Sequence, residues 1–152
     1  MSLRLREAGP SDAYALWVWA NDPETRASVA SRAEIAWDTH VAWLLSQLGN
    51  PCALVWIGEL DASQPVGTIR FDTTDNWGTA RLSYTIAPES RGRGLGREIV
   101  ALGVARLREL RPVARVWADV GETNGRSRRI FERLSWRLER PAPGSLRFWA
   151  VS

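Results

Sequence analysis

A short segment rich in glycine and arginine is the part of the sequence best suited to bind a charged ligand. Residues 91–97 read Arg, Gly, Arg, Gly, Leu, Gly and Arg. Glycines at alternate positions let the backbone adopt left-handed conformations and approach a ligand with no Cβ in the way. The guanidinium groups of Arg91, Arg93 and Arg97 add charge-assisted hydrogen-bond donors. These features are typical of a turn that binds phosphate groups.

The turn connects a predicted strand, which ends near residue 87, to a predicted helix over residues 95–110. Unpaired N–H groups and the helix dipole favour an anion at the start of such a helix. The Rossmann fingerprint does not fit, because it needs a glycine where Arg97 stands, and the P-loop needs a lysine that this chain does not have. Taken alone, the segment leaves a strand-to-helix turn without a ligand as the alternative.

The elements that position this turn alternate between helical and strand patterns. Helices are predicted over residues 11–20, 36–48, 95–110 and 124–134. Strands are predicted over residues 3–7, 52–60, 66–73, 79–87 and 114–120, near 137, and over 145–151. Three of these strands in the middle of the chain indicate an antiparallel meander. We therefore expect an α/β fold in one domain, residues 1–152, with a mixed, mostly antiparallel sheet flanked by helices.

The Gly-rich turn resembles that of the GNAT acetyltransferase superfamily. The acetyl-CoA motif of that family is Arg or Gln, two residues of any type, Gly, any residue, and then Gly or Ala, and Arg91, Gly94 and Gly96 match it. Residues 86–88 look like the end of the family's fourth strand, and residues 124–136 look like its later helix that begins with Asn. The resemblance implies a GNAT-like fold in which the fourth and fifth strands splay apart at the cofactor cleft.

The same resemblance implies that acetyl-CoA is the cosubstrate, without a metal, and that an amine receives the acetyl group. A backbone N–H near Ile86 would polarise the thioester carbonyl where negative charge develops, and Asn124 would hydrogen-bond the cofactor arm. The cofactor-binding residues carried over are Ile86, Arg91, Gly92, Arg93, Gly94, Leu95, Gly96, Arg97 and Asn124.

An amine must lose its proton before it attacks a thioester, so a base is expected. Asp119 stands five residues before Asn124, at the end of a predicted strand, where some enzymes of the family carry a water-linked glutamate. Glu122 in the adjacent loop is the second candidate. For both residues, a carboxylate in an ion pair with a nearby arginine is the alternative.

The proton donor departs from the family pattern. Many members place a tyrosine seven residues after the Asn, whereas this chain has Phe131 there, and phenylalanine cannot donate a proton. Tyr84, Ser127 or water is the expected donor to the leaving thiolate.

The first two helices are where this superfamily builds its acceptor site, and we predict substrate contacts from Trp19, Asn21, Arg26, Trp37 and His40. Core packing is the alternative for many of the tryptophans in this region. The residue order looks like the branch that acetylates nucleotide-linked amino sugars, which is the preferred acceptor class. It is also similar to the branch that acetylates protein N-termini, including those of ribosomal proteins. A non-catalytic acyl-CoA sensor is a further alternative, because Phe131 leaves the proton donor open.

Composition narrows the remaining classes. Cys52 and His40 are the only cysteine and histidine, which disfavours zinc clusters and Cys-His or Ser-His hydrolases. Cys52 itself is expected to be a buried thiol within a strand. The net charge is only +3 and the arginines are scattered, so no nucleic-acid partner is expected. The chain also lacks a long apolar run. We expect a cytoplasmic protein that acts on a small-molecule amine without a membrane partner, and the sequence leaves open whether it forms a homodimer.

Overall fold

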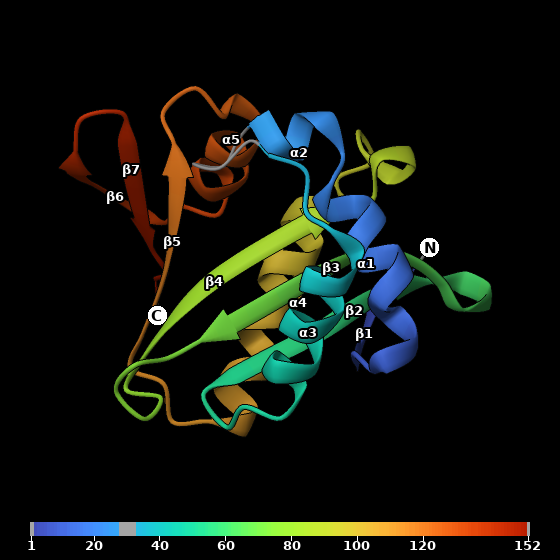
Figure 1. The fold of residues 1–152 in the computed structure, drawn as a ribbon. Coiled ribbons are helices and arrows are strands. Elements are labelled where there is room, and N and C mark those ends of the chain that lie inside the picture. Colours follow the sequence, from blue (N-terminus) through green and yellow to red (C-terminus); the bar gives the residue numbers. More distant parts are fainter. Residues whose placement is uncertain (1, 28–32, 152) are drawn as a thin grey trace.

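The computed structural model describes residues 2–27 and 33–151, and in this part of the chain seven strands form one mixed sheet (Figure 1). The strand order is β1-β2-β3-β4-β5-β7-β6. The strands are β1 (Arg4–Glu7), β2 (Ala53–Leu60), β3 (Gln64–Asp72), β4 (Thr79–Ile86), β5 (Arg115–Gly121), β6 (Arg137–Ala142) and β7 (Ser145–Trp149). Neighbouring strands are antiparallel except for β4 and β5. The sheet confirms the predicted α/β architecture.

The helices are α1 (Ala13–Ala20), α2 (Pro23–Ala27), α3 (Trp37–Leu48), α4 (Leu95–Leu110) and α5 (Gly125–Arg133). Short 3-10 turns cover Pro10–Asp12, Asp61–Ser63 and Pro88–Ser90. In Figure 1, α1 and α3 lie in front of the sheet and α4 lies behind it. Both faces of the central strands are therefore covered.

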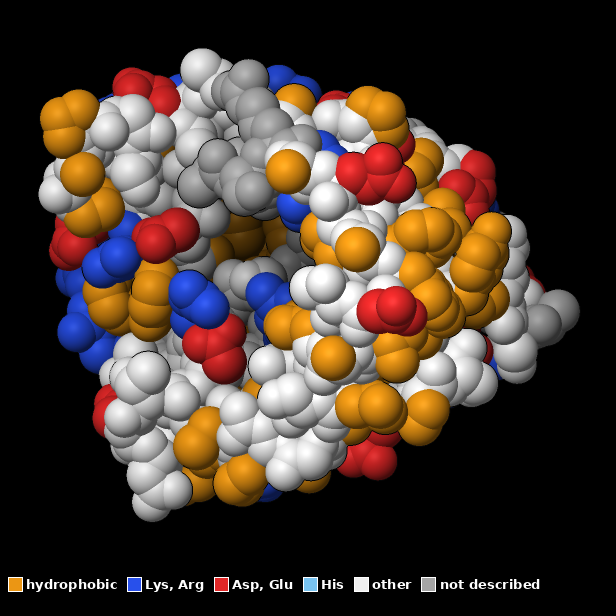
Figure 2. Space-filling view, in the orientation of Figure 1, with side chains coloured by type: hydrophobic (Ala, Val, Ile, Leu, Met, Phe, Trp, Pro, Cys, Tyr) orange, Lys and Arg blue, Asp and Glu red, His pale blue; other side chains and the backbone are white. Residues whose placement is uncertain are grey.

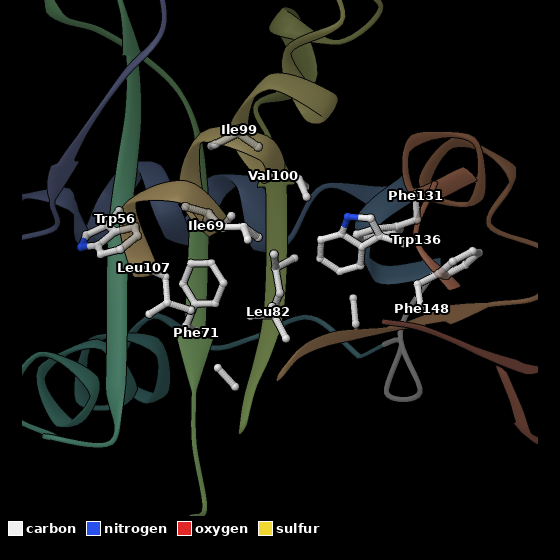
Figure 3. Packing of buried hydrophobic residues seen from close by; sticks show 14 of the residues in the cluster. Trp56, Ile69, Phe71, Leu82, Ile99, Val100, Leu107, Phe131, Trp136 and Phe148 are labelled. Atoms are coloured by element: carbon white, nitrogen blue, oxygen red, sulfur yellow. The ribbon is translucent and has the colours of Figure 1, made fainter. Parts of the chain in front are cut away.

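The main core lies between the sheet and α4, where buried side chains of both elements interdigitate (Figure 3). Ile69 and Phe71 of β3 are fully buried in this cluster together with Ile99 and Leu107 of α4. A Cβ at Gly103 would lie 2.5 Å from the Cδ1 atom of Ile69, so the glycine lets α4 approach the strand closely. This packing fixes the direction in which the start of α4 points.

A second, smaller core lies on the opposite face of the sheet, under α1 and α3. Leu16 and Trp19 of α1, Leu44 of α3 and Ile57 of β2 belong to it. Because successive side chains of a strand point to opposite faces, the residues of β3 that alternate with Ile69 and Phe71 face this side.

The parallel pairing of β4 with β5 covers only a short stretch. Thr79–Arg81 pairs with residues 115–117, and no further rungs of the ladder follow toward the C-terminal ends of the two strands. The strands therefore diverge in front of the start of α4. This divergence confirms the splayed strands that were expected at the cofactor cleft.

Two local predictions differ from the structure. The first helix ends at Ala20 as predicted, but the short helix α2, which begins at Pro23, was not predicted. Proline is tolerated at this position because the first N–H of a helix has no partner. Cys52 was expected to be buried, but it is exposed in the turn before β2, with its N–H donating to the Oδ1 atom of Asn50 at 2.9 Å. Across the described ranges, no helix has both the length and the apolar character needed to span a membrane.

Candidate active site

The Gly-rich turn has a backbone that only glycine adopts readily. Gly92 and Gly94 have φ angles of +79° and +76°, in the left-handed region. Gly94 is the N-cap of α4, so the turn ends at the positive end of the helix dipole. A Cβ at either glycine would meet no atom within 4 Å. Glycine is thus required by backbone conformation, and the space in front of the turn is open.

A cavity of about 450 Å³ lies at this turn, between the end of β4 and α5. All the predicted cofactor residues except Arg93 line it. Its lining consists of Glu24, Thr25, Tyr84, Thr85, Ile86, Ser90, Arg91, Gly92, Gly94, Leu95, Gly96, Arg97, Asn124, Arg126, Ser127, Arg129, Ile130 and Arg133. Arginines and the start of a helix converge here, which suits an anionic ligand. We call this space the cofactor cavity.

The N–H of Ile86 faces the gap between β4 and β5. The N–H of the next residue, Ala87, donates to the carbonyl of Val66 of β3 at 2.8 Å. Because successive N–H groups of an extended strand point in opposite directions, the N–H of Ile86 points away from β3. At that level β5 supplies no ladder partner. A fixed donor of this kind can stabilise an oxyanion.

Asn124 caps α5 and lines the same cavity. Its Oδ1 atom accepts a hydrogen bond from the N–H of Ser127 at 3.2 Å. The cap fixes the orientation of the amide group, which leaves the Nδ2 donors for another partner. Asn124 is therefore placed to donate to a ligand in the cofactor cavity.

Tyr84 and Ser127, both predicted as proton donors, contact each other. The phenol oxygen of Tyr84 lies 2.7 Å from the Oγ atom of Ser127, joining β4 to α5 across the gap. Burial raises the pKa of Tyr84, so its hydroxyl group is protonated at neutral pH. Phe131 lies in the core and is 1% exposed. A phenol thus reaches the cavity from β4.

A second cavity of about 530 Å³ lies under α1 and α3, and we call it the acceptor cavity. Its lining consists of Leu16, Trp19, Ala20, Thr25, Arg26, Ile35, Thr39, His40, Trp43, Val55, Thr68, Arg70, Ser83, Tyr84 and Thr85. Thr25, Tyr84 and Thr85 line both cavities. The face shown in Figure 2 is hollowed near its centre, where arginine and hydrophobic side chains lie side by side.

Three of the five predicted acceptor residues, Trp19, Arg26 and His40, line this cavity, whereas Asn21 and Trp37 do not. Asn21 instead binds the main chain of Ile35, donating to its carbonyl at 3.0 Å and accepting from its N–H at 2.7 Å. Trp37 is 40% exposed, and its ring packs against Trp17 with centroids 5.3 Å apart. The predicted substrate contacts of Asn21 and Trp37 are therefore not part of this cavity.

The buried side chain of His40 forms part of the lining of the acceptor cavity. It is 4% exposed, and its ring lies 5.4 Å from that of Trp43. Burial lowers the pKa of His40, so the imidazole is neutral near pH 7. Its Nε2 atom has no hydrogen-bond partner among the described residues.

Arg70 of β3 also lines this cavity, and sequence reasoning missed it. The sequence feature that could have identified Arg70 is its position between the apolar residues Ile69 and Phe71, in a strand that is covered on both faces.

The two predicted bases lie elsewhere. Asp119 forms an ion pair with Arg147 of β7, with 2.8 Å between Oδ1 and Nε. Glu122 forms an ion pair with Arg140, with 3.5 Å between Oε1 and Nη1. Neither residue lines a cavity described above. The alternation of β5 explains the position of Asp119, because its neighbours Ala118 and Val120 face the core. The described part of the chain also holds no cluster of three or more side chains suited to a metal ion.

Comparison with known families agrees with this geometry. Residues 2–137 match the family model described as an acetyltransferase (GNAT) domain. A search of curated protein sequences gave no match.

Solved structures similar to this chain share its fold. One is a ribosomal-protein-alanine N-acetyltransferase from Brucella melitensis, which is 20% identical, with 98% of this chain and 99% of that chain covered and a TM-score of 0.81. An aminoglycoside acetyltransferase, AAC(6')-Ib, in complex with coenzyme A is 20% identical over 97% and 92% of the chains, with a TM-score of 0.79. A putative acetyltransferase from Salmonella typhimurium with acetyl-CoA is 18% identical over 98% and 92%, with a TM-score of 0.74.

Proposed function

Because this chain belongs to the GNAT acetyltransferase family, whose members use acetyl-CoA, we propose that it transfers the acetyl group to a primary amine bound in the acceptor cavity. One observation carries this proposal. Tyr84 and Thr85, at the end of β4, line both cavities, so the two spaces meet beside the gap between β4 and β5. The thioester and the amine can therefore meet at one point.

The cofactor cavity supplies the binding groups. Main-chain N–H groups of the turn around Gly92 and Gly94, with the guanidinium groups of Arg91 and Arg97, would hold the pyrophosphate of acetyl-CoA. Asn124 would donate from Nδ2 to the pantetheine arm. Bound acetyl-CoA supplies an activated acetyl group as its thioester.

The residues at the junction would assist the transfer itself. The N–H of Ile86 would stabilise the negative charge that develops on the carbonyl oxygen as the amine nitrogen attacks. The carbon–sulfur bond then breaks, and Tyr84 would donate its proton to the departing thiolate, with Ser127 as its hydrogen-bond partner. The amine nitrogen, which is positively charged after the attack, would lose a proton to solvent, and solvent would return a proton to Tyr84.

The amine can lose its proton without a carboxylate at the site. Apolar walls and the guanidinium groups of Arg26 and Arg70 disfavour an ammonium ion in the acceptor cavity, because desolvation and like charge both lower the pKa of a bound amine. The proton would pass to solvent as the amine binds. Asp119 and Glu122 remain predicted bases that would have to act through intervening groups.

The preferred acceptor is a nucleotide-linked amino sugar. Trp19 and Trp43 offer aromatic faces suited to a ring, and Arg26 lies in the same lining. No carboxylate of the described residues lines the acceptor cavity. A polycationic aminoglycoside, such as the kanamycin bound in one similar structure, is disfavoured because its charges would be unpaired. A protein N-terminus, the acceptor named for the Brucella enzyme, is the competing class.

The test is release of coenzyme A thiol from acetyl-CoA in the presence of single amines. The panel contains a nucleotide-linked amino sugar, a peptide with a free N-terminal alanine, and kanamycin. We expect the amino sugar to give the highest kcat/KM. Faster turnover of the peptide would transfer the proposal to the competing class. Acetyl-CoA binding without thiol release for any amine would instead indicate a non-catalytic sensor.

A further inference from the structure

Arg70 is a charged residue in the interior of the sheet. It stands in the middle of β3, opposite Val55 of β2 and Ser83 of β4, and all three residues line the acceptor cavity. Trp43 of α3 covers the guanidinium group, with its ring centroid 5.0 Å from the Cζ atom. The stacking restricts the guanidinium to the wall of the cavity beside Trp43.

The guanidinium of Arg70 forms no hydrogen bond or ion pair with any of the described residues. The nearest candidate carboxylate, Asp72, is already bound by Arg81, with 3.1 Å between Oδ2 and Nη2. Burial lowers the pKa of Arg70, which reflects the cost of removing this charge from water. An arginine nevertheless stays protonated near neutral pH. Arg70 thus carries a positive charge and hydrogen-bond donors that the protein leaves without a partner.

The described lining of the acceptor cavity does not balance this charge, and Asp72, which acts on it from the end of β3, is paired with Arg81. Arg26 adds a second positive group to the lining, His40 is neutral, and no aspartate or glutamate of the described residues lines the cavity. A planar guanidinium matches the paired oxygens of a carboxylate or a phosphate. We propose that Arg70 is the specificity-determining residue of the acceptor cavity and binds an anionic group, carboxylate or phosphate, carried by the acceptor amine.

This inference rests on the proposed function, because it assumes that the amine binds in the acceptor cavity. It adds a requirement that the family does not supply, namely a negative charge on the acceptor. It also gives Arg70 a role in binding and none in the chemical step.

The experiment compares matched amines that differ in charge. The phosphate arm pairs a nucleotide-linked amino sugar with the free amino sugar, and the carboxylate arm pairs aminobutyrate with its amide. Thiol release gives kcat and KM for the wild type, Arg70→Gln and Arg70→Lys. Arg108→Gln is the control, because it removes an exposed arginine of α4, on the opposite face of the sheet from the acceptor cavity.

We expect the wild type to prefer the anionic member of at least one pair by tenfold or more in kcat/KM. Arg70→Gln should raise KM for that member about tenfold to hundredfold, the usual range for a lost charge-assisted contact, and should leave the neutral member within about twofold. Arg70→Lys should give a KM between those of the wild type and Arg70→Gln, because lysine keeps the positive charge but lacks the paired N–H donors of a guanidinium. Arg108→Gln should keep the preference. The arm that shows the preference identifies the anion.

Two results would overturn the inference while leaving the proposed function intact. One is a wild type that acetylates amines without preferring the anionic member in either arm. The other is an Arg70→Gln variant that loses both members of a pair equally, even though its unfolding temperature and its thermal shift with acetyl-CoA match the wild type. If no amine releases thiol from the wild type, the proposed function fails and the inference fails with it.

Discussion

Arg91 of the Gly-rich turn is bound to Asp22, with 3.0 Å between Nη2 and Oδ2. The same guanidinium contacts Glu24 of α2 at 2.8 Å through Nη1. Desolvation acts to raise the pKa of Asp22, but the hydrogen bonds from Arg91 and from the N–H of Thr25 outweigh it and lower the pKa. The start of α2 is therefore tied to the turn that lies in front of α4, and α2 carries Arg26 of the acceptor cavity.

Arg91→Gln is expected to impair both substrates. The variant removes a donor to the pyrophosphate and also releases α2, so KM should rise severalfold to tenfold for acetyl-CoA and for the acceptor amine. Arg97→Gln is the matched control, because Arg97 lines the cofactor cavity without an ion pair among the described residues. It should raise KM for acetyl-CoA alone. Identical effects of the two variants in steady-state kinetics would contradict the link through α2.

Tyr84→Phe should lower kcat by about a hundredfold at neutral pH while KM values change little, because general acid catalysis commonly contributes about that factor or more. Tyr14→Phe is the control, since Tyr14 is the other tyrosine and is 66% exposed. The raised pKa of Tyr84 also predicts that kcat shows no loss from phenol ionisation below about pH 10. A Tyr84→Phe variant with full kcat would leave water as the proton donor.

Gly94→Ala tests the backbone of the turn. A left-handed φ of +76° disfavours alanine by about 1–2 kcal/mol, although space for the Cβ is open. If the turn responds by changing conformation, its N–H groups move and the Kd for acetyl-CoA should rise at least tenfold. Gly121→Ala serves as the control, because its Cβ also meets no atom and its φ is ordinary. Calorimetric titration with acetyl-CoA measures both, and unchanged affinity for Gly94→Ala would remove the turn from the binding site.

The lowered pKa of His40 predicts that the folded chain loses stability on mild acidification. Its pKa in the folded chain lies below its usual value of 6.5, so the unfolded chain binds a proton before the folded chain does. The stability contributed by the neutral form is therefore complete above about pH 6.5 and falls as the pH drops toward the folded pKa. The slope should reach at most about 1.4 kcal/mol per pH unit.

Urea unfolding between about pH 7.5 and 5 measures this effect. His40 is the only histidine, so His40→Gln should flatten the profile in that range. A variant as pH-dependent as the wild type would show that another group is responsible.

Asp119→Asn addresses the base predicted from the sequence. Its carboxylate lies on Arg147, outside both cavities, so we expect kcat within about twofold of the wild type. The ion pair is largely exposed, and its loss should cost less than about 1 kcal/mol in thermal unfolding. A large fall in kcat with unchanged KM would restore Asp119 as the base.

The sequence predicted the elements best where local patterns and packing agree. The helix over residues 95–110 begins and ends as predicted, because an apolar stripe follows a glycine turn. The expected burial of Cys52 was wrong and α2 was not predicted, because both depend on details of turns. Asn50 and Pro51 extend the turn past Cys52, and Asp22 accepts from the N–H of Thr25 at 3.2 Å, which allows a new helix to begin at once.

In the candidate site too, residues that are close in the sequence were predicted better than residues that packing brings together. The predicted cofactor residues of the turn follow one another in the sequence and carry a recognisable spacing, and most of them line one cavity. The acceptor cavity is built from α1, α3, β3 and β4, and Arg70 joins it only because helices cover that face of the sheet. Trp37 and Asp119 were placed by their neighbourhood in the chain, yet the sides of α3 and β5 on which they lie are set by packing against the cores.

The short parallel pairing of β4 with β5 has a consequence for how long the protein resists proteolysis in a cell. Where the ladder stops, the sheet keeps unpaired edges in its interior, and a bound ligand would complete them much as an added strand would. Ligand that binds only the folded chain suppresses unfolding in proportion to its concentration. The abundance of this protein should therefore follow the supply of acyl-CoA, through slower proteolysis when that supply is high.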